Sequence, residues 1–277
     1  MSKPFDATLR TLLEVSPAAW PALIGQRPAP TEVIEADVST VTGGADKVLR
    51  VRATPEYLLH LEFQAGPDQS LPARTNRSSA ILADRHQLLV RSVVVLLRPR
   101  AQLSSLNGVF ERAFPGEPPY LTFRYQILRV WQLPVEPLLT GAVGLLPLAP
   151  ISAVTEAQLP GVLSRMQERL RAEPKAVAQD LWTAAYVLLG LYYERGFLDQ
   201  LLREVMGMEE SDTYMAILEK GETRGALREI RKTLLLLGSK RFGAPTAALA
   251  AAVEAIDDLD RLEQLSLRLL DVGSWEE

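Results

Sequence analysis

The hydrophobic pattern of this chain changes near residue 134, and that change limits the folds open to it. Before it, short runs rich in Val, Leu and other strand-forming residues are separated by turn residues. After it, apolar residues recur at helical spacing, and several prolines lie at the transition. The pattern predicts an α/β domain with a mixed sheet flanked by helices, followed by an all-α C-terminal region.

The front part predicts the order helix, three strands, helix, strand, with one more strand before the transition. The expected helices cover residues 5–15 and 72–87. The expected strands cover residues 33–41, 46–52, 56–64, 90–99 and 121–131.

The back part predicts helices at residues 156–172, 177–195, 198–205, 211–237, 245–255 and 259–270. With 277 residues the chain exceeds the usual size of one hydrophobic core. We therefore expect three units, a sheet domain at 1–140, a helical extension at 141–210 and a C-terminal helical domain at 211–277.

The composition excludes several classes of site. There is no cysteine, which excludes disulfides, thiolate zinc sites, iron–sulfur clusters and cysteine nucleophiles. The start MSKPFDATLR lacks the apolar core of a signal peptide, and no apolar stretch reaches the roughly 20 residues needed to cross a bilayer. We therefore expect a cytoplasmic protein with no membrane partner.

Charge is distributed unevenly between the two halves. Lys and Arg minus Asp and Glu give 15 − 12 = +3 for residues 1–132, and 15 − 22 = −7 for residues 133–277. The front half is therefore the more suitable side for binding a phosphate polyanion.

The most informative segment, residues 45–64, contains two strand-like runs joined by a short loop. If Arg52 faces Glu56 as an opposite-charge pair, the antiparallel register places Asp46 opposite Glu62. Two carboxylates would then meet across the ladder.

Side chains alternate between the two faces of a strand, so His60, Glu62 and Gln64 share one face, and the apolar residues between them share the other. The same register places Val48 opposite His60. A slip of two positions would bring Asp46 opposite Gln64, so the acidic group survives a modest error in register.

Acidic residues in mid-strand need a positive partner, because facing like charges cost roughly 0.2–1 kcal/mol per pair. A hard divalent cation is the simplest candidate, since Mg²⁺ prefers carboxylate oxygens and retains several waters. Such an ion would polarise a phosphoryl oxygen and lower the pKa of a coordinated water, which is the chemistry of phosphodiester hydrolysis.

Several phrases of the sequence resemble the recombination-promoting nuclease family, a transposase-like branch of the PD-(D/E)XK nucleases. They are PFDATLRTLLE, DVSTVTGGADKVLRV, LLHLEFQ, VRSVVVLLRP and VWQLPVEPLL. The later stretches LLLLGSKRFGAP and IDDLDRLEQLSLRLLDVGSWE resemble a helical domain often appended to these proteins.

The resemblance implies a restriction-endonuclease-like sheet and a metal-dependent DNA endonuclease linked to recombination or mobile elements. It implies Asp46 and Glu62 as ligands of Mg²⁺ or Mn²⁺, with the backbone carbonyl of Phe63 as a further ligand. Gln64 replaces the lysine usual in the motif, and glutamine cannot supply a cation.

Arg74 and Arg77, at the start of the second expected helix, are candidates to supply that charge or to contact the DNA phosphates. Glu14, on the first helix, and Asp37, in the first strand, are lesser candidates for the acidic centre.

Each of these residues also has a structural interpretation. Asp46 alone fits a turn, Glu62 fits an ion pair with a residue such as Arg50, and His60 fits a hydrogen-bonded scaffold. Arginines on a solvated helix face are commonplace, and Gln64 fits a plain solvated side chain.

Two alternatives to the enzyme follow. The front half could be a catalytically degenerate nuclease fold that acts as a DNA-binding or protein-interaction module. The C-terminal helices, with Gly221 and Gly225 at helix-packing spacing, could form a homo-oligomer.

Overall fold

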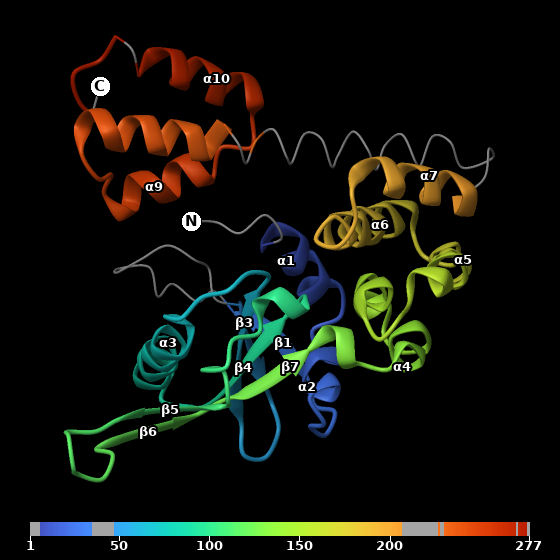
Figure 1. Cartoon of the computed structure of the whole chain (residues 1–277), viewed down its shortest axis with the longest axis horizontal. Helices are drawn as coiled ribbons and strands as arrows, with labels where there is room; N and C mark the ends of the chain where they lie inside the picture. The colour runs from blue at the N-terminus through green and yellow to red at the C-terminus, as the bar shows by residue number, and fades with distance from the viewer. Residues whose placement is uncertain (1–5, 35–46, 207–226, 228–229, 270, 276–277) are drawn as a thin grey trace.

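The computed structural model describes residues 6–34, 47–206, 227, 230–269 and 271–275. A twisted sheet occupies one part of the molecule, with helices on both of its faces, and further helices lie beside it (Figure 1). The mixed α/β class and the helical C-terminal region are therefore confirmed.

The main sheet has five strands in the order β1-β2-β3-β4-β7. They are β1 (Thr31–Ile34), β2 (Lys47–Val51), β3 (Tyr57–Gln64), β4 (Leu89–Leu96) and β7 (Gln126–Arg129). The first three pair antiparallel, whereas β3, β4 and β7 run parallel, so the sheet is mixed as predicted. The rest of the expected first strand, from residue 35, lies outside the described residues.

The register of β2 against β3 is the predicted one, with Val48 opposite His60. The ion pair predicted between Arg52 and Glu56 is wrong. Glu56 accepts two hydrogen bonds from Arg50, at 2.9 and 3.0 Å, and Arg52 binds Glu32 on β1 at 2.9 Å instead. The register is right because the apolar face of both strands must be buried in phase.

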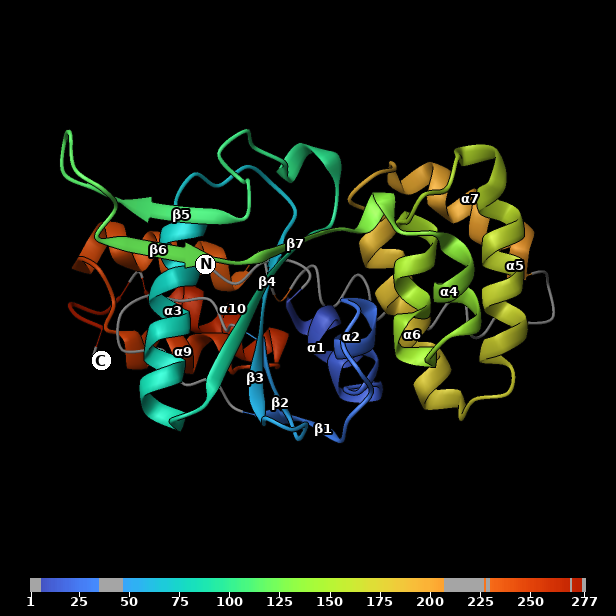
Figure 2. The same cartoon turned by 90° about the horizontal axis from the view of Figure 1, so that it is seen from below.

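Helices cover the two faces of the sheet unequally (Figure 2). On one face lies α3 (Leu71–His86), which begins with Pro72 in its first turn and ends at Gln87, a residue in the left-handed conformation. On the other lie α1 (Asp6–Val15) and the short α2 (Ala19–Leu23). The amphipathic first helix is thus confirmed.

The strand expected at 121–131 is wrong as a single element. It is divided into β6 (Leu121–Arg124) and β7, and β6 pairs antiparallel with β5 (Val109–Arg112) in a separate hairpin that projects from the sheet (Figure 1). The strand is interrupted at Tyr125, whose N–H donates to the carbonyl of Gly108. Gly108 and Gly116 have positive φ, which permits the turns of this hairpin.

The helical extension packs on the α1 side of the sheet. Its elements are η2 (Val130–Gln132), α4 (Val135–Thr140), η3 (Val143–Ile151), η4 (Glu156–Gln158), α5 (Leu159–Leu170), α6 (Lys175–Leu189) and α7 (Arg195–Met206). The three α-helices predicted between 156 and 205 are confirmed, whereas α2, α4 and η3 were not predicted.

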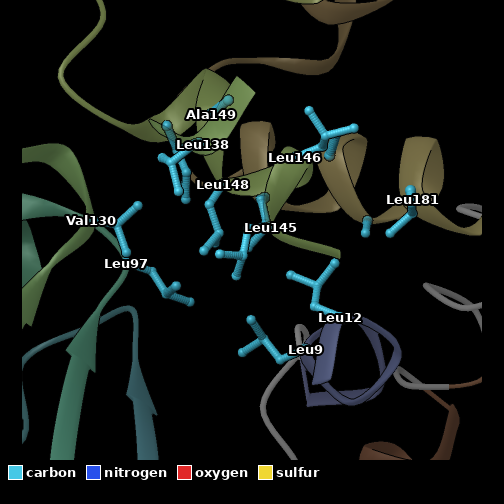
Figure 3. Close-up of a cluster of buried hydrophobic side chains, with 14 of the residues drawn as sticks. Leu9, Leu12, Leu97, Val130, Leu138, Leu145, Leu146, Leu148, Ala149 and Leu181 are labelled. Atoms are coloured by element: carbon cyan, nitrogen blue, oxygen red, sulfur yellow. The ribbon is translucent and has the colours of Figure 1, made fainter. Parts of the chain in front are cut away.

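One hydrophobic core joins these elements to the sheet. Leu9 and Leu12 of α1, Leu97 after β4, and the apolar η3 segment converge in it (Figure 3). The η3 residues are almost all buried. Two prolines lie within this segment, and its 3₁₀ turns tolerate them.

Two polar side chains also tie the sheet to the extension. The Arg98 guanidinium donates to the carbonyl of Ala65 at 2.5 Å and to that of Leu191 at 2.7 Å, and the Tyr192 hydroxyl donates to the carbonyl of Leu97 at 2.8 Å. The turn between α6 and α7 is therefore fixed to the ends of β3 and β4.

The C-terminal part contains a helix over 230–242, α9 (Ala247–Glu254) and α10 (Leu259–Arg268), which share a small apolar cluster. The last two helices are confirmed, and the expected 211–237 helix is described only in its final part, where it extends to 242. Gly221 and Gly225 lie outside the described residues. No helix within the described ranges is long and apolar enough to cross a membrane.

Candidate functional site

A buried polar group lies between β3 and α3. His60, Glu62 and Gln64 point to the α3 side, and they are 0%, 4% and 7% exposed. Apolar clusters flank them on this face, one around Leu58 and the other around Leu71. Burying a carboxylate among apolar residues is costly unless it is paired and hydrogen-bonded, so its partners decide what the group does.

Arg74 of α3 holds two carboxylates at once. Its Nη2 donates to Glu62 Oε2 at 3.1 Å, and its Nη1 donates to Asp68 Oδ2 at 2.9 Å. Asp68 belongs to the loop between β3 and α3, where its other oxygen accepts hydrogen bonds from the N–H and hydroxyl of Ser70. One guanidinium therefore brings together an acid of the strand and an acid of the loop.

The pKa values of this group follow from its geometry. Burial opposes the charge of Arg74, but attraction to Glu62 and Asp68 outweighs it and raises the Arg74 pKa above its ordinary value. Burial would raise the pKa of Asp68, yet hydrogen bonds from Ser70 and the charge of Arg74 lower it overall. Both groups therefore keep their charge at neutral pH.

His60 extends the polar group along the strand. Its Nδ1 lies 3.2 Å from the hydroxyl of Ser92 on β4, and its Nε2 lies 3.8 Å from Glu62 Oε1. The ring is fully buried, which agrees with its interpretation as a hydrogen-bonded scaffold.

Gln64 anchors the acidic loop to the end of β3. Its Nε2 donates to the carbonyl of Gly66 at 2.7 Å, two residues before Asp68. The side chain is buried, so the interpretation as a plain solvated residue is wrong.

The structure brings together some of the predicted residues and not others. Arg74 binds Glu62, and Gln64 lies on the same face of β3 as Glu62, whereas Arg77 is exposed on α3. Asp46 and Asp37 lie outside the described residues. Glu14 pairs with Arg10 at 2.8 Å on α1, which covers the opposite face of the sheet, so it is not placed beside Glu62.

One expectation about partners is wrong. The partner of Glu62 is Arg74 and not Arg50, which is bound to Glu56. Asp68 was not predicted as part of the site. Its position two residues before Ser70, at the start of a helix, has the usual signature of a turn or cap, and nothing local indicates a second role.

The oxygen donors suit a divalent cation in their chemistry. Glu62 and Asp68 both bind the single guanidinium of Arg74, so two carboxylates lie close to one another. Carboxylate oxygens are the donors that Mg²⁺ prefers. Across the described ranges, however, no three His, Cys, Asp or Glu side chains form a group that could hold a metal ion, so a complete site would need a further donor.

Comparison with known proteins adds no relative, because no family model, curated protein or solved structure matches the chain.

Proposed function

We propose that this chain is a metal-dependent endonuclease that hydrolyses phosphodiester bonds in DNA, with its centre at the end of β3. The proposal depends on one observation, that Glu62 is buried in mid-sheet and that Arg74 brings it together with Asp68. Paired carboxylates of this kind provide the oxygen donors that Mg²⁺ prefers.

Glu62 and Asp68 would hold the ion, together with Asp46 and the Phe63 carbonyl named by the family resemblance. Mg²⁺ or Mn²⁺ bound there would supply a water of lowered pKa and polarise a phosphoryl oxygen. Asp68 adds a described carboxylate to the two acids that the resemblance implies.

The other residues have positioning roles. Gln64 holds the loop that carries Asp68, and Arg74 sets the separation of the two acids. Because Gln64 cannot supply the cation of the usual motif lysine, Arg74 and Arg77 would provide positive charge for the DNA phosphates.

A specific observation favours the second candidate, a degenerate nuclease fold that binds DNA or protein. Arg74 already supplies Glu62 with a positive partner at 3.1 Å, so the buried glutamate is compensated without any metal. The two functions differ in whether a cation is needed.

Nicking of supercoiled plasmid separates them. We expect cleavage with Mg²⁺ or Mn²⁺ and none with chelator, and we expect Glu62→Gln and Asp68→Asn each to lower the rate by at least about 100-fold. Asp84→Asn removes an exposed acid on α3, and this matched control should cleave like wild type.

Equal cleavage by all four proteins would contradict the assigned centre. Absence of cleavage and of Mn²⁺ binding, with DNA binding retained in a fluorescence anisotropy assay, would establish the degenerate module instead.

A further inference from the structure

A cavity of about 900 Å³ opens at the other end of the parallel strands. It lies between the turn after α2, the loop that joins β2 to β3, and the starts of β4 and β7. Three arginines line it, Arg27, Arg91 and Arg124, and no aspartate or glutamate does. The cavity is therefore strongly basic although the chain as a whole is acidic.

These arginines differ from those of the neighbouring strand. Arg50 and Arg52 on β2 and its end are each bound to a glutamate. Arg27, Arg91 and Arg124 are exposed and form no ion pair with any residue in the described ranges. Several like charges gathered around one hollow repel each other and favour a bound anion.

The side chain of Arg91 is held in place within the cavity. The Arg91 guanidinium lies over the Tyr57 ring, 5.7 Å from its centroid, which restricts the side chain by a cation–π contact. A guanidinium held in this way keeps its fork of donors available to a planar or tetrahedral oxyanion.

The cavity is separate from the acidic group at Glu62. Arg91 pairs in register with Leu59, and Tyr57 lies two residues before Leu59, so both side chains point to the α1 side of the sheet. Glu62 points to the α3 side and lies nearer the opposite end of β3. A ligand in the cavity would therefore need neither the acids nor a metal.

We propose that this cavity binds a ligand carrying two or more phosphate groups. An arginine guanidinium forms two parallel hydrogen bonds with phosphate oxygens. Three arginines supply more donors than a single carboxylate can accept. The volume falls within the roughly 300–1,000 Å³ typical of small-molecule sites, so a nucleotide fits. The phosphates of a nucleic-acid strand have the same chemistry, and the experiment distinguishes the two sources.

Isothermal titration calorimetry of the full chain in low-salt buffer with chelator tests the proposal. The probes are pyrophosphate, adenosine triphosphate and a short single-stranded DNA. We expect saturable binding by wild type, weakened about tenfold or more in Arg91→Gln and in Arg124→Gln. Arg100→Gln, an exposed arginine outside the cavity, is the control and should bind like wild type.

Binding of pyrophosphate and adenosine triphosphate supports a nucleotide pocket, and binding of DNA alone supports a contact surface for a phosphate backbone. No binding of any probe, or equal binding by wild type and both cavity variants, overturns the proposal. Because chelator is present throughout, this outcome does not depend on whether the acidic group binds metal.

Discussion

The two faces of β3 differ sharply in polarity over its second half. Leu59, Leu61 and Phe63 enter the large core with α1, whereas His60, Glu62 and Gln64, the residues between them, form the polar group under α3. The two faces of this strand therefore have different roles. The apolar face stabilises the fold by burial, and the polar face holds paired charged groups that add little as a whole but are costly to separate.

The largest effect should come from the apolar face. Leu59 is fully buried, so Leu59→Ala removes apolar contacts and leaves a cavity, and we expect the free energy of unfolding to fall by about 2–5 kcal/mol. Urea denaturation followed by circular dichroism measures it. A loss below about 1 kcal/mol would show that the core collapses around the deletion and that the two faces are less different than described.

Loss of Arg74 should have the next largest effect. Arg74→Met leaves Glu62 buried without its cation, and since Arg74 is itself 29% exposed we expect a loss of about 1–3 kcal/mol. Combining it with Glu62→Gln should recover part of that loss, with a coupling of about 1 kcal/mol in the double-mutant cycle. Additive losses would mean that the pair does not hold the polar face together.

The acidic loop should respond to pH more weakly. The folded pKa of Asp68 is lowered from its ordinary 3.8, so its contribution to stability is present above that value and is lost as the pH falls through the folded pKa. Thermal melts of wild type and Asp68→Asn at decreasing pH should therefore show a constant difference above about pH 5 and a shrinking one below 3.8. A difference that grows on acidification would reverse the assigned shift.

The smallest effect should come from Glu14. Its pair with Arg10 is exposed and spaced i,i+4, so Glu14→Gln should change the free energy of unfolding by less than about 0.5 kcal/mol. Plasmid nicking, if wild type shows it, should be unchanged. A strong loss of cleavage would join α1 to the acidic centre and remove the separation of the two faces.

Alternation made much of the sheet predictable. From Leu59 to Gln64 strand β3 alternates apolar and polar residues, so its two faces could be assigned from the sequence, and the register against β2 was predicted correctly. The hairpin of β5 and β6 could not be recognised in the same way, because its short strands are largely exposed and lack a strong apolar pattern. Only its turn glycines mark it.

The sequence made it predictable that Glu62 needs a positive partner, but not which residue supplies it. A glutamate in mid-strand must have a positive neighbour, and Glu62 was selected for that reason. The neighbour found in the structure, Arg74, lies twelve residues away on a helix, and its contact depends on how α3 packs over the sheet. Asp68 depends on the same packing, so neither contact has a local signature.

The hydrogen bonds of Arg98 connect the acidic loop to the helical extension. One guanidinium connects the carbonyl of Ala65, at the root of the loop that carries Asp68, to the turn between α6 and α7. We therefore expect substitutions in that turn to shift the root of the acidic loop, although the two segments lie far apart along the chain.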